Sequence, residues 1–177
     1  FITKYFYNKY YNCSPIVISI EGNIGSGKST LVEFLREEFG DIVYFAPEPV
    51  GEWLELTDEN GINLLENFYK DKKRWSYSFQ NYAYISRMCE IQKAIKSGYR
   101  VIITERSIKT DKNIFAQMLY DEKDMNEMEM KMYNKWYNTF NNISTTNVYL
   151  KTSTDNCKLR INRRNRQGES TIDLNYL

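Results

Sequence analysis

The chain has 177 residues, with 24 lysines and arginines against 23 aspartates and glutamates, and a formal net charge of +1. This length suits a single domain with its own core, and the balanced charge excludes a strong bulk attraction to nucleic acid or to a membrane surface. No apolar run is long enough to span a bilayer, and the absence of histidine excludes Ser-His-Asp and Cys-His catalysis and most zinc sites.

Residues 1–15 are expected to form a loose terminal arm, and residues 16–177 one domain. The arm is basic and aromatic and lacks the apolar segment of a signal peptide, so the tail of a transit peptide is the alternative. Because the chain begins with Phe1, we expect the natural start to lie upstream. The cysteines show neither disulfide nor zinc spacing, which favours a reducing compartment. A cytoplasmic protein is expected, with mitochondria as the alternative.

Four short apolar runs predict β-strands, and helical patterns separate them. The strands are expected over 16–22, 41–49, 99–107 and 147–153. Helices are expected over 29–39, about 62–97 with a turn near Asp71, 111–142, and from near Asp155. This alternation predicts an α/β fold of three layers, in which helices flank a parallel sheet on both faces.

Large apolar residues recur at helical spacing within the stretch 111–142. They are Met125, Met128, Met132, Trp136 and Phe140. Such a stripe is more typical of a core or a subunit contact than of a cofactor site.

Residues 22–29 fit the pattern of a phosphate-binding P-loop: Gly22, four residues, then Gly27, Lys28 and Ser29. In such a loop, backbone N–H groups and a helix N-terminus face the phosphates. Lys28 is expected to neutralise the β- and γ-phosphates of a nucleotide, and the Ser29 hydroxyl suits Mg²⁺. The motif lies between a predicted strand and a predicted helix, which is the context that a P-loop requires.

Acidic residues lie in the last few positions of the next two predicted strands, at the same edge of the sheet as the P-loop. Glu48 lies between two prolines, and a carboxylate fixed there can accept a proton from an attacking hydroxyl. Glu105 can hold Mg²⁺, and Arg106 can stabilise charge on a transferring phosphoryl group. A solvated loop acid at 48 and a structural ion pair at 105–106 are the alternatives.

The segment KLRINRRNR, residues 158–166, holds the local excess of basic residues. Arg160, Arg163 and Arg164 lie on adjacent helical turns, and Arg166 follows. Three interpretations fit the string: a solvated basic helix, a nucleic-acid or nuclear-import patch, or a lid that brings arginines onto ATP. The P-loop in the same domain favours the lid.

An aromatic-rich helix is expected around residues 74–87, with Phe79 and Gln80 adjacent and Arg87 two turns later. An aromatic face can stack on a base, and a primary amide can bond a base edge. Helices of this composition are more often core.

Together these strings resemble the deoxynucleoside kinase family, which includes deoxycytidine, deoxyguanosine and mitochondrial thymidine kinases. The matching pieces are EGNIGSGKST, PEPVGEW, FYKDKKRWSYSFQNYAYISR, ERSIKTD, NIFAQMLY, MNE and RINRRNRQGESTIDLNYL. They run in the family's order from about Ile16 to the end. The resemblance implies a P-loop NTPase-type fold and phosphorylation of the 5′-hydroxyl of deoxynucleosides, a step of nucleotide salvage. It also implies ATP and Mg²⁺ as cofactors and a homodimer. No nucleic-acid or membrane partner is expected, because the charge is balanced and no apolar run could span a bilayer.

The resemblance implies two sets of binding residues. The ATP site comprises Gly22, Asn23, Ile24, Gly25, Ser26, Gly27, Lys28, Ser29, Thr30, Arg160, Arg164 and Arg166. The nucleoside site comprises Glu48, Trp53, Tyr69, Phe79, Gln80, Arg87, Arg106, Asp111 and Glu169. Ser29 and Glu105 are the implied Mg²⁺ ligands, and Lys28, Glu48, Glu105, Arg106 and Arg164 the implied catalytic residues.

The family also implies individual roles in the nucleoside site. Glu48 is the implied base for the 5′-hydroxyl, although the family leaves Glu105 as the alternative proton acceptor, and Arg106 holds Glu48 and the 5′ end. Trp53 and Phe79 line the pocket, with Phe79 stacked on the base, and Gln80 bonds the base. Tyr69 and Glu169 hold the 3′-hydroxyl.

Arg87 and Asp111 fall on base-facing family positions. A carboxylate accepts hydrogen bonds, and cytosine and adenine offer an exocyclic amine where thymine shows an acceptor oxygen and a methyl group. Thymidine-accepting relatives lack this pair. Deoxycytidine or purine deoxynucleosides are therefore expected to be preferred over thymidine.

The chain departs from the family pattern near its end. The lid, expected over 158–170, carries one acid, Glu169, with Gly168 where relatives have a second. The family continues past the position of Leu177 with further helices and a fifth strand, so that C-terminal strand is expected to be missing here.

Two other kinds of protein remain as alternatives. A nucleoside monophosphate kinase of the thymidylate type shares the P-loop, but the PEPVGEW, RWSYSFQ and ERS strings favour a nucleoside as acceptor. A non-catalytic kinase-like subunit would be expected to lose Lys28, Glu48 or Arg106, and all are present. A nucleic-acid-binding module is disfavoured because the basic excess is confined to one short stretch.

Overall fold

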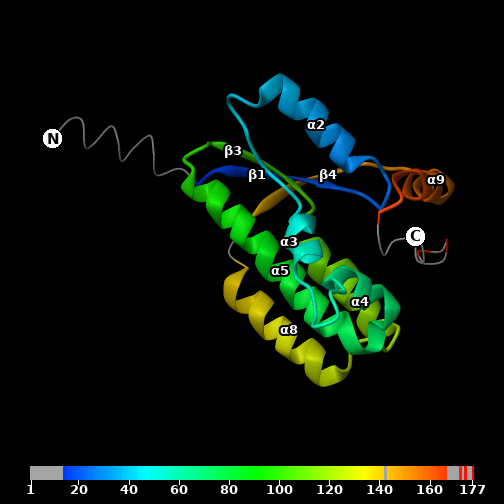
Figure 1. Cartoon of the computed structure of the whole chain (residues 1–177). Coiled ribbons are helices and arrows are strands. Elements are labelled where there is room, and N and C mark those ends of the chain that lie inside the picture. Colours follow the sequence, from blue (N-terminus) through cyan, green and yellow to red (C-terminus); the bar gives the residue numbers. More distant parts are fainter. Residues whose placement is uncertain (1–13, 142, 167–171, 173, 175–176) are drawn as a thin grey trace.

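The computed structural model describes residues 14–141, 143–166, 172, 174 and 177, and it contains one sheet in that part of the chain. The strands are β1 (Ile16–Glu21), β2 (Tyr44–Ala46), β3 (Val101–Glu105) and β4 (Thr145–Tyr149). Their order is β2-β3-β1-β4 and every pairing is parallel. The predicted α/β fold with a parallel sheet is thus confirmed, and the carboxyl ends of all strands share one edge (Figure 1).

The helices follow the strands in the alternation that the sequence predicts. They are α2 (Lys28–Phe39), α3 (Val50–Glu55), α4 (Leu64–Lys70), α5 (Lys72–Lys96), α6 (Ile108–Thr110), the π-helix η1 (Asp111–Ala116), α7 (Gln117–Asp121), α8 (Glu127–Phe140) and α9 (Thr154–Arg164). Figure 1 shows α2 on one face of the sheet and α5 with α8 on the other. Among the described residues, no helix is both long and apolar enough to cross a membrane.

Adjacent residues of a strand point to opposite faces, and helices cover both faces of β1 and β3, whereas the edge strand β4 is largely exposed. On the α2 face, Ile20 and Ile103 pack with Val32 in a small core. On the other face, Val17 and Ile102 join a much larger core that includes residues of α5 and α8. The three predicted layers therefore have two unequal cores, and the larger one lies beneath the helices that carry the aromatic residues.

Three segments differ from the sequence prediction. β2 is shorter than 41–49 because prolines follow Ala46, and α3, which the sequence did not predict, begins directly after Pro49. The predicted helix over 111–142 is interrupted between α7 and α8, where Lys123 has a φ of 66°. A capping box of Asn126 and Glu129 then starts α8. β4 covers Thr145–Tyr149, so it begins two residues before the predicted strand 147–153 and ends four residues before that strand's predicted end.

The interruption divides the apolar stripe into two parts. Met125 lies in the turn before α8 and is buried. Met128, Met132, Trp136 and Phe140 lie on α8 with exposed fractions between 41% and 65%. The larger part of the stripe is therefore a surface of this chain and not part of its core.

Candidate active site

The P-loop connects β1 to α2, as the sequence predicts. Gly25 and Gly27 have φ values of 74° and 100°, a left-handed backbone that glycine adopts without strain. Lys28 is buried, and its Nζ donates to the Asn23 carbonyl at 2.7 Å. Burial, together with the nearby Arg106, lowers the pKa of Lys28 to about 8. The loop therefore holds a desolvated ammonium group, which a phosphate would help to keep charged.

The P-loop packs against α9 and the segment just before it. The Ser26 carbonyl accepts hydrogen bonds from Arg160 Nη1 at 2.6 Å and from Thr152 Oγ1 at 3.0 Å. A Cβ atom at Gly25 would lie 2.5 Å from the Cys157 carbonyl oxygen, so this position has room only for glycine. Arg160, a predicted lid arginine, is thus bonded to the P-loop backbone in this structure.

Glu48 lies beyond the tip of β2, where prolines on both sides fix its backbone. Its Oε1 atom is 2.9 Å from Arg106 Nη1 and 3.2 Å from Arg87 Nη2. Burial alone would raise the pKa of Glu48, but Arg106 and Arg87 outweigh burial and lower it to about 2. Glu48 is therefore ionised across the neutral pH range.

Arg106 keeps unused hydrogen-bond donors in the site. It adopts a φ of 65°, which is unusual for a residue with a Cβ, and its guanidinium lies 5.1 Å from the centroid of the Phe115 ring. Its Nε and Nη2 atoms are buried and have no hydrogen-bond partner among the described residues. Unpaired buried donors are costly, so this cation is suited to an anionic or hydroxyl-bearing ligand.

Glu105, at the end of β3, faces the P-loop. The Ser29 hydroxyl lies 3.0 Å and 3.1 Å from its two carboxylate oxygens. Burial, and then the charge of Glu48, raise the pKa of Glu105. No group of three or more acidic or cysteine side chains able to hold a metal ion occurs within the described part of the chain. One hydroxyl and one carboxylate beside a phosphate loop fit Mg²⁺, which takes oxygen ligands and completes its shell with phosphates and water.

Arg87 links Glu48 to Asp111. Arg87 Nε donates to Asp111 Oδ2 at 2.8 Å, and both side chains are almost completely buried. The two acids oppose burial and raise the pKa of Arg87, while burial outweighs Arg87 and raises the pKa of Asp111. η1 carries Asp111 at its first position, and π-helical turns are frequent at functional sites.

Aromatic rings from α3, α4 and α5 form the other wall of the site. Phe68 and Phe79 stack with centroids 4.5 Å apart, and Trp53 meets Phe79 edge-on at 5.4 Å. The indole N–H of Trp53 donates to Ser86 Oγ at 3.0 Å, which fixes the orientation of the ring. The wall is therefore a rigid apolar surface.

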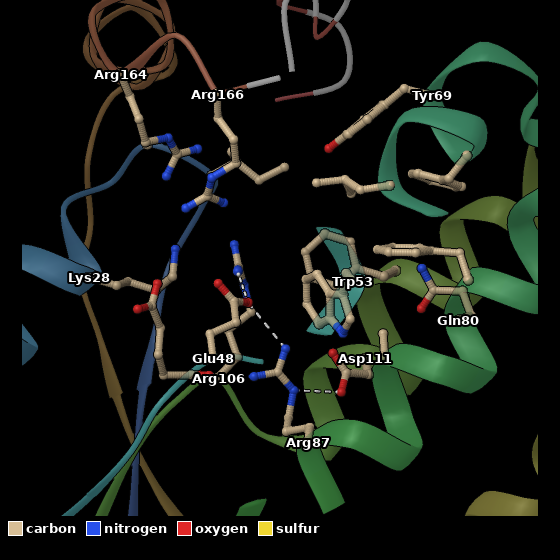
Figure 2. A pocket seen from close by; sticks show the side chains of 18 residues that line it. Lys28, Glu48, Trp53, Tyr69, Gln80, Arg87, Arg106, Asp111, Arg164 and Arg166 are labelled. Atoms are coloured by element: carbon tan, nitrogen blue, oxygen red, sulfur yellow. Dashed lines mark hydrogen bonds and ion pairs between the residues drawn. The ribbon is translucent and has the colours of Figure 1, made fainter. Parts of the chain in front are cut away.

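One cavity brings together all the predicted nucleoside-site residues that the structure describes. They are Glu48, Trp53, Tyr69, Phe79, Gln80, Arg87, Arg106 and Asp111. Figure 2 shows Lys28, Glu48 and Arg106 on one side of this pocket, with Tyr69, Trp53 and Gln80 on the other. Glu169 and Gly168, named from the lid string, lie outside the described residues.

A second cavity lies over the P-loop. Of the predicted ATP-site residues it contains Gly25, Ser26, Gly27, Lys28, Ser29, Thr30, Arg160 and Arg164. Gly22 and Asn23 line neither cavity, while Ile24 and Arg166 line the nucleoside-side cavity. The two cavities share Gly25, Lys28, Glu105 and Arg164. Two compartments thus meet at an ammonium, a guanidinium and a carboxylate.

Sequence reasoning missed several residues of the site. Leu65, Phe68, Ala83 and Phe115 also line the nucleoside-side cavity. Ala83 lies one turn from Phe79, Gln80 and Arg87, and Phe115 lies four residues after Asp111, so helical spacing was the available signal.

The buried Glu21 was also missed, although it organises the strand ends. Its Oε1 accepts from the Ser107 backbone N–H at 2.9 Å, and its Oε2 accepts from Thr110 Oγ1 at 2.7 Å. Glu21 therefore ties the tip of β1 to the segment after β3, which fixes the position of Arg106. An acid that ends an otherwise apolar strand was the signal in the sequence.

Comparison with known proteins agrees with this geometry. The family model described as deoxynucleoside kinase matches residues 18–177. The probable deoxycytidine kinase of Fowlpox virus is 39% identical over 177 residues, covering 96% of this chain and 72% of the relative. Human deoxycytidine kinase is 36% identical, covering 90% and 70%, and the mitochondrial deoxyguanosine kinase of Xenopus laevis is 35% identical, covering 90% and 68%. The chain belongs to the deoxynucleoside kinase family.

Proposed function

We propose that this protein transfers the γ-phosphoryl group of ATP to the 5′-hydroxyl of a deoxynucleoside. The observation that carries the proposal is the meeting of the two cavities at Lys28, Glu105 and Arg164. A nucleotide whose phosphates occupy the P-loop cavity would present its terminal phosphate to whatever fills the aromatic cavity. The names of the relatives, a probable deoxycytidine kinase, a deoxycytidine kinase and a deoxyguanosine kinase, support a nucleoside in that position.

Glu48 is the proposed proton acceptor. It is ionised at neutral pH and lies beside Arg106, whose two unpaired nitrogens can hold the 5′ end of the substrate. A carboxylate of such low pKa is a weak base, but phosphoryl transfer depends mainly on positioning and charge stabilisation and little on base strength. Glu48 therefore orients the hydroxyl, and takes its proton as the bond to phosphorus forms.

Ser29 and Glu105 are the proposed ligands of Mg²⁺, which would neutralise charge on the bound phosphates. Lys28, Arg164 and Arg166 contribute positive charge around the transferring group, and Figure 2 shows both arginines reaching toward the pocket from the end of α9. Residues 16–177 act as one domain in this proposal. The lid, residues 158–170, closes over the reactants and excludes water.

At the far end of the cavity, the proposed acceptor base lies against Phe79 and within reach of Gln80, Arg87 and Asp111. The proposed preference is for deoxycytidine or a purine deoxynucleoside over thymidine, because the Asp111 carboxylate accepts hydrogen bonds and thymine offers a carbonyl at the matching position. Tyr69 points into the cavity from α4 and is the proposed partner of the sugar 3′-hydroxyl (Figure 2).

The proposed homodimer uses the exposed face of α8. Trp136 and Phe140 stack with centroids 6.0 Å apart at the surface, beside the exposed Met128 and Met132. A row of large apolar side chains on one helix is suited to packing against the same helix of a second copy.

The test is phosphoryl transfer from ATP and Mg²⁺ to the four deoxynucleosides and to their 5′-monophosphates. Transfer to nucleosides, weakest with thymidine and lost in Glu48→Gln, would support the acceptor, the base and the specificity together. Transfer only to monophosphates would contradict the nucleoside as acceptor. Transfer to neither would point to a kinase-like protein without catalysis.

A further inference from the structure

Two buried tyrosine hydroxyls lie behind the base-recognition end of the cavity. Tyr84 on α5 and Tyr133 on α8 are each only 1% exposed, and their rings meet edge-on with centroids 6.1 Å apart. Neither hydroxyl has a hydrogen-bond partner among the described residues. A buried hydroxyl without a partner is unfavourable, so a pair of them at one place calls for an explanation.

Both tyrosines lie on helices that pack against η1, the element that begins with Asp111. The helices α5 and α8 also pack against each other. Burial raises the pKa of Tyr84 to about 12, with Tyr137 and the negative charge of Asp111 adding to the rise. Burial and then Asp111 raise the pKa of Tyr133. The two phenols and the acid therefore belong to one buried polar group.

One carboxylate oxygen of Asp111 can accept a hydrogen bond within this group. Asp111 Oδ2 is the acceptor of the bond from Arg87, and among the described residues no hydrogen bond to Asp111 Oδ1 is found. A buried polar site with three such partners is the kind of place where proteins hold an internal water, which typically makes about three hydrogen bonds. Such a water can accept from the two phenols and donate to the acid.

We propose that Tyr84 and Tyr133 hold one buried water against Asp111, and so act as positioning residues for the carboxylate that selects the base. This inference rests on the proposed function, because it assigns the two tyrosines to the substrate preference of that same site. Arg87 holds Asp111 from the cavity side and the water holds it from the core side. The carboxylate then keeps one orientation toward the base.

The test replaces each tyrosine by phenylalanine, which removes the hydroxyl and keeps the ring. Tyr84→Phe and Tyr133→Phe are each expected to lower the urea midpoint of unfolding. They are also expected to reduce the preference for deoxycytidine over thymidine, measured as the ratio of kcat/KM values, by about tenfold, as for a lost hydrogen bond to a charged group. The KM for ATP should not change.

Tyr137→Phe is the matched control. Tyr137 lies one turn after Tyr133 on α8, and its ring is also 6.1 Å from that of Tyr84. Its hydroxyl is not among the buried unpaired atoms, and burial alone raises its pKa. This variant should keep the wild-type ratio. In an Asp111→Asn background, Tyr133→Phe should change neither the ratio nor the midpoint much further, because the acid that it positions is gone.

Two results would overturn the proposal. If the Tyr→Phe variants unfold at the same or a higher urea concentration and keep the kcat/KM ratio, then the hydroxyls are unpaired and hold no water against Asp111. If they lose stability but keep the ratio, their role is structural only. A failure of the proposed function can be told apart from a failure of this inference. A wild-type protein that phosphorylates no deoxynucleoside would contradict the function alone. The unfolding cycle between Tyr133→Phe and Asp111→Asn would still decide whether the contact exists.

Discussion

Glu48 and Arg106 form a largely buried ion pair across the tips of β2 and β3, with 2.9 Å between Glu48 Oε1 and Arg106 Nη1. Arg87 reaches the same oxygen from α5. Three elements that are far apart in the sequence thus converge on one carboxylate. This convergence gives the site its geometry in the absence of substrate, because a paired buried charge is held in one place.

Glu48→Gln is expected to lower kcat by roughly 10²-fold to 10⁴-fold, the usual contribution of a positioned proton acceptor. The amide keeps the shape of the side chain but cannot take the proton. Steady-state kinetics with saturating ATP and deoxynucleoside would measure the loss. Glu55→Gln, at the exposed end of α3, is the control and should retain wild-type kcat. A Glu48→Gln enzyme with nearly full kcat would move the proton acceptor to Glu105.

The same carboxylate makes stability depend on pH. The pKa of Glu48 is lowered from 4.5 to about 2 in the fold, so its stabilising effect is fully present above pH 4.5 and is lost as the pH falls toward 2. The free energy of unfolding should therefore fall less steeply in Glu48→Gln than in wild type over that interval. Urea unfolding at several pH values would show the difference. Parallel curves would mean that Glu48 has an ordinary pKa.

Lys28 should take up a proton when nucleotide binds. Its pKa is lowered from 10.5 to about 8, so around pH 8 nearly half of the free protein carries a neutral lysine. Bound phosphates favour the charged form, and binding should be accompanied by uptake of about half a proton near pH 8 and almost none near pH 6.5. Calorimetric titrations in buffers of different ionisation enthalpy would measure this. In Lys28→Arg the uptake should vanish, since arginine is always charged.

Removal of the buried pair at the base-facing end should admit thymidine. Asp111→Ala alone would leave the Arg87 charge with one partner fewer, and breaking such a pair is strongly destabilising. Arg87→Met with Asp111→Ala removes both charges and makes room for a methyl group. We expect the thymidine to deoxycytidine ratio of kcat/KM to rise by about 10²-fold, a typical gain when unpaired polar groups no longer reject a substrate. An unchanged ratio would place base selection elsewhere in the cavity.

Charge on the exposed face of α8 should prevent self-association. Trp136→Lys introduces a cation into the stacked pair with Phe140, and sedimentation should then show a monomer. Ile42→Lys is the control, because Ile42 is 69% exposed but lies in the turn before β2. Wild-type protein that sediments as a monomer would contradict the proposed homodimer.

The sequence predicted which residues lie together at the sheet edge better than it predicted the boundaries of the elements. Glu48, Glu105 and the P-loop were expected together because parallel strands end at one edge of the sheet, and the structure shows them there. Local patterns could not predict α3, because a six-residue helix between a proline and a loop has too little periodicity. They also could not show that Lys123 interrupts the long helix, since a left-handed backbone at lysine has no signature in the sequence.

Side-chain partnerships were the hardest feature to predict. The pairing of Arg87 with both Glu48 and Asp111 depends on the packing of α5 against η1, which periodicity does not fix. The bond from Arg160 to the Ser26 carbonyl was unexpected for the same reason, since a basic helix reveals its charge but not its contacts. Glu21 was missed because a buried acid is exceptional, and its three hydrogen bonds become visible only in the fold.

The contact between Gly25 and the Cys157 carbonyl has an evolutionary consequence. A Cβ atom at position 25 would also approach Ile161 to 3.0 Å, so any larger residue would have to push α9 away from the phosphate loop. The two segments cannot drift independently, because a change in one must be matched by a shift of the other. Variation in the lid should accordingly accumulate on the outward side of α9, while the side against the loop stays constant among functional descendants.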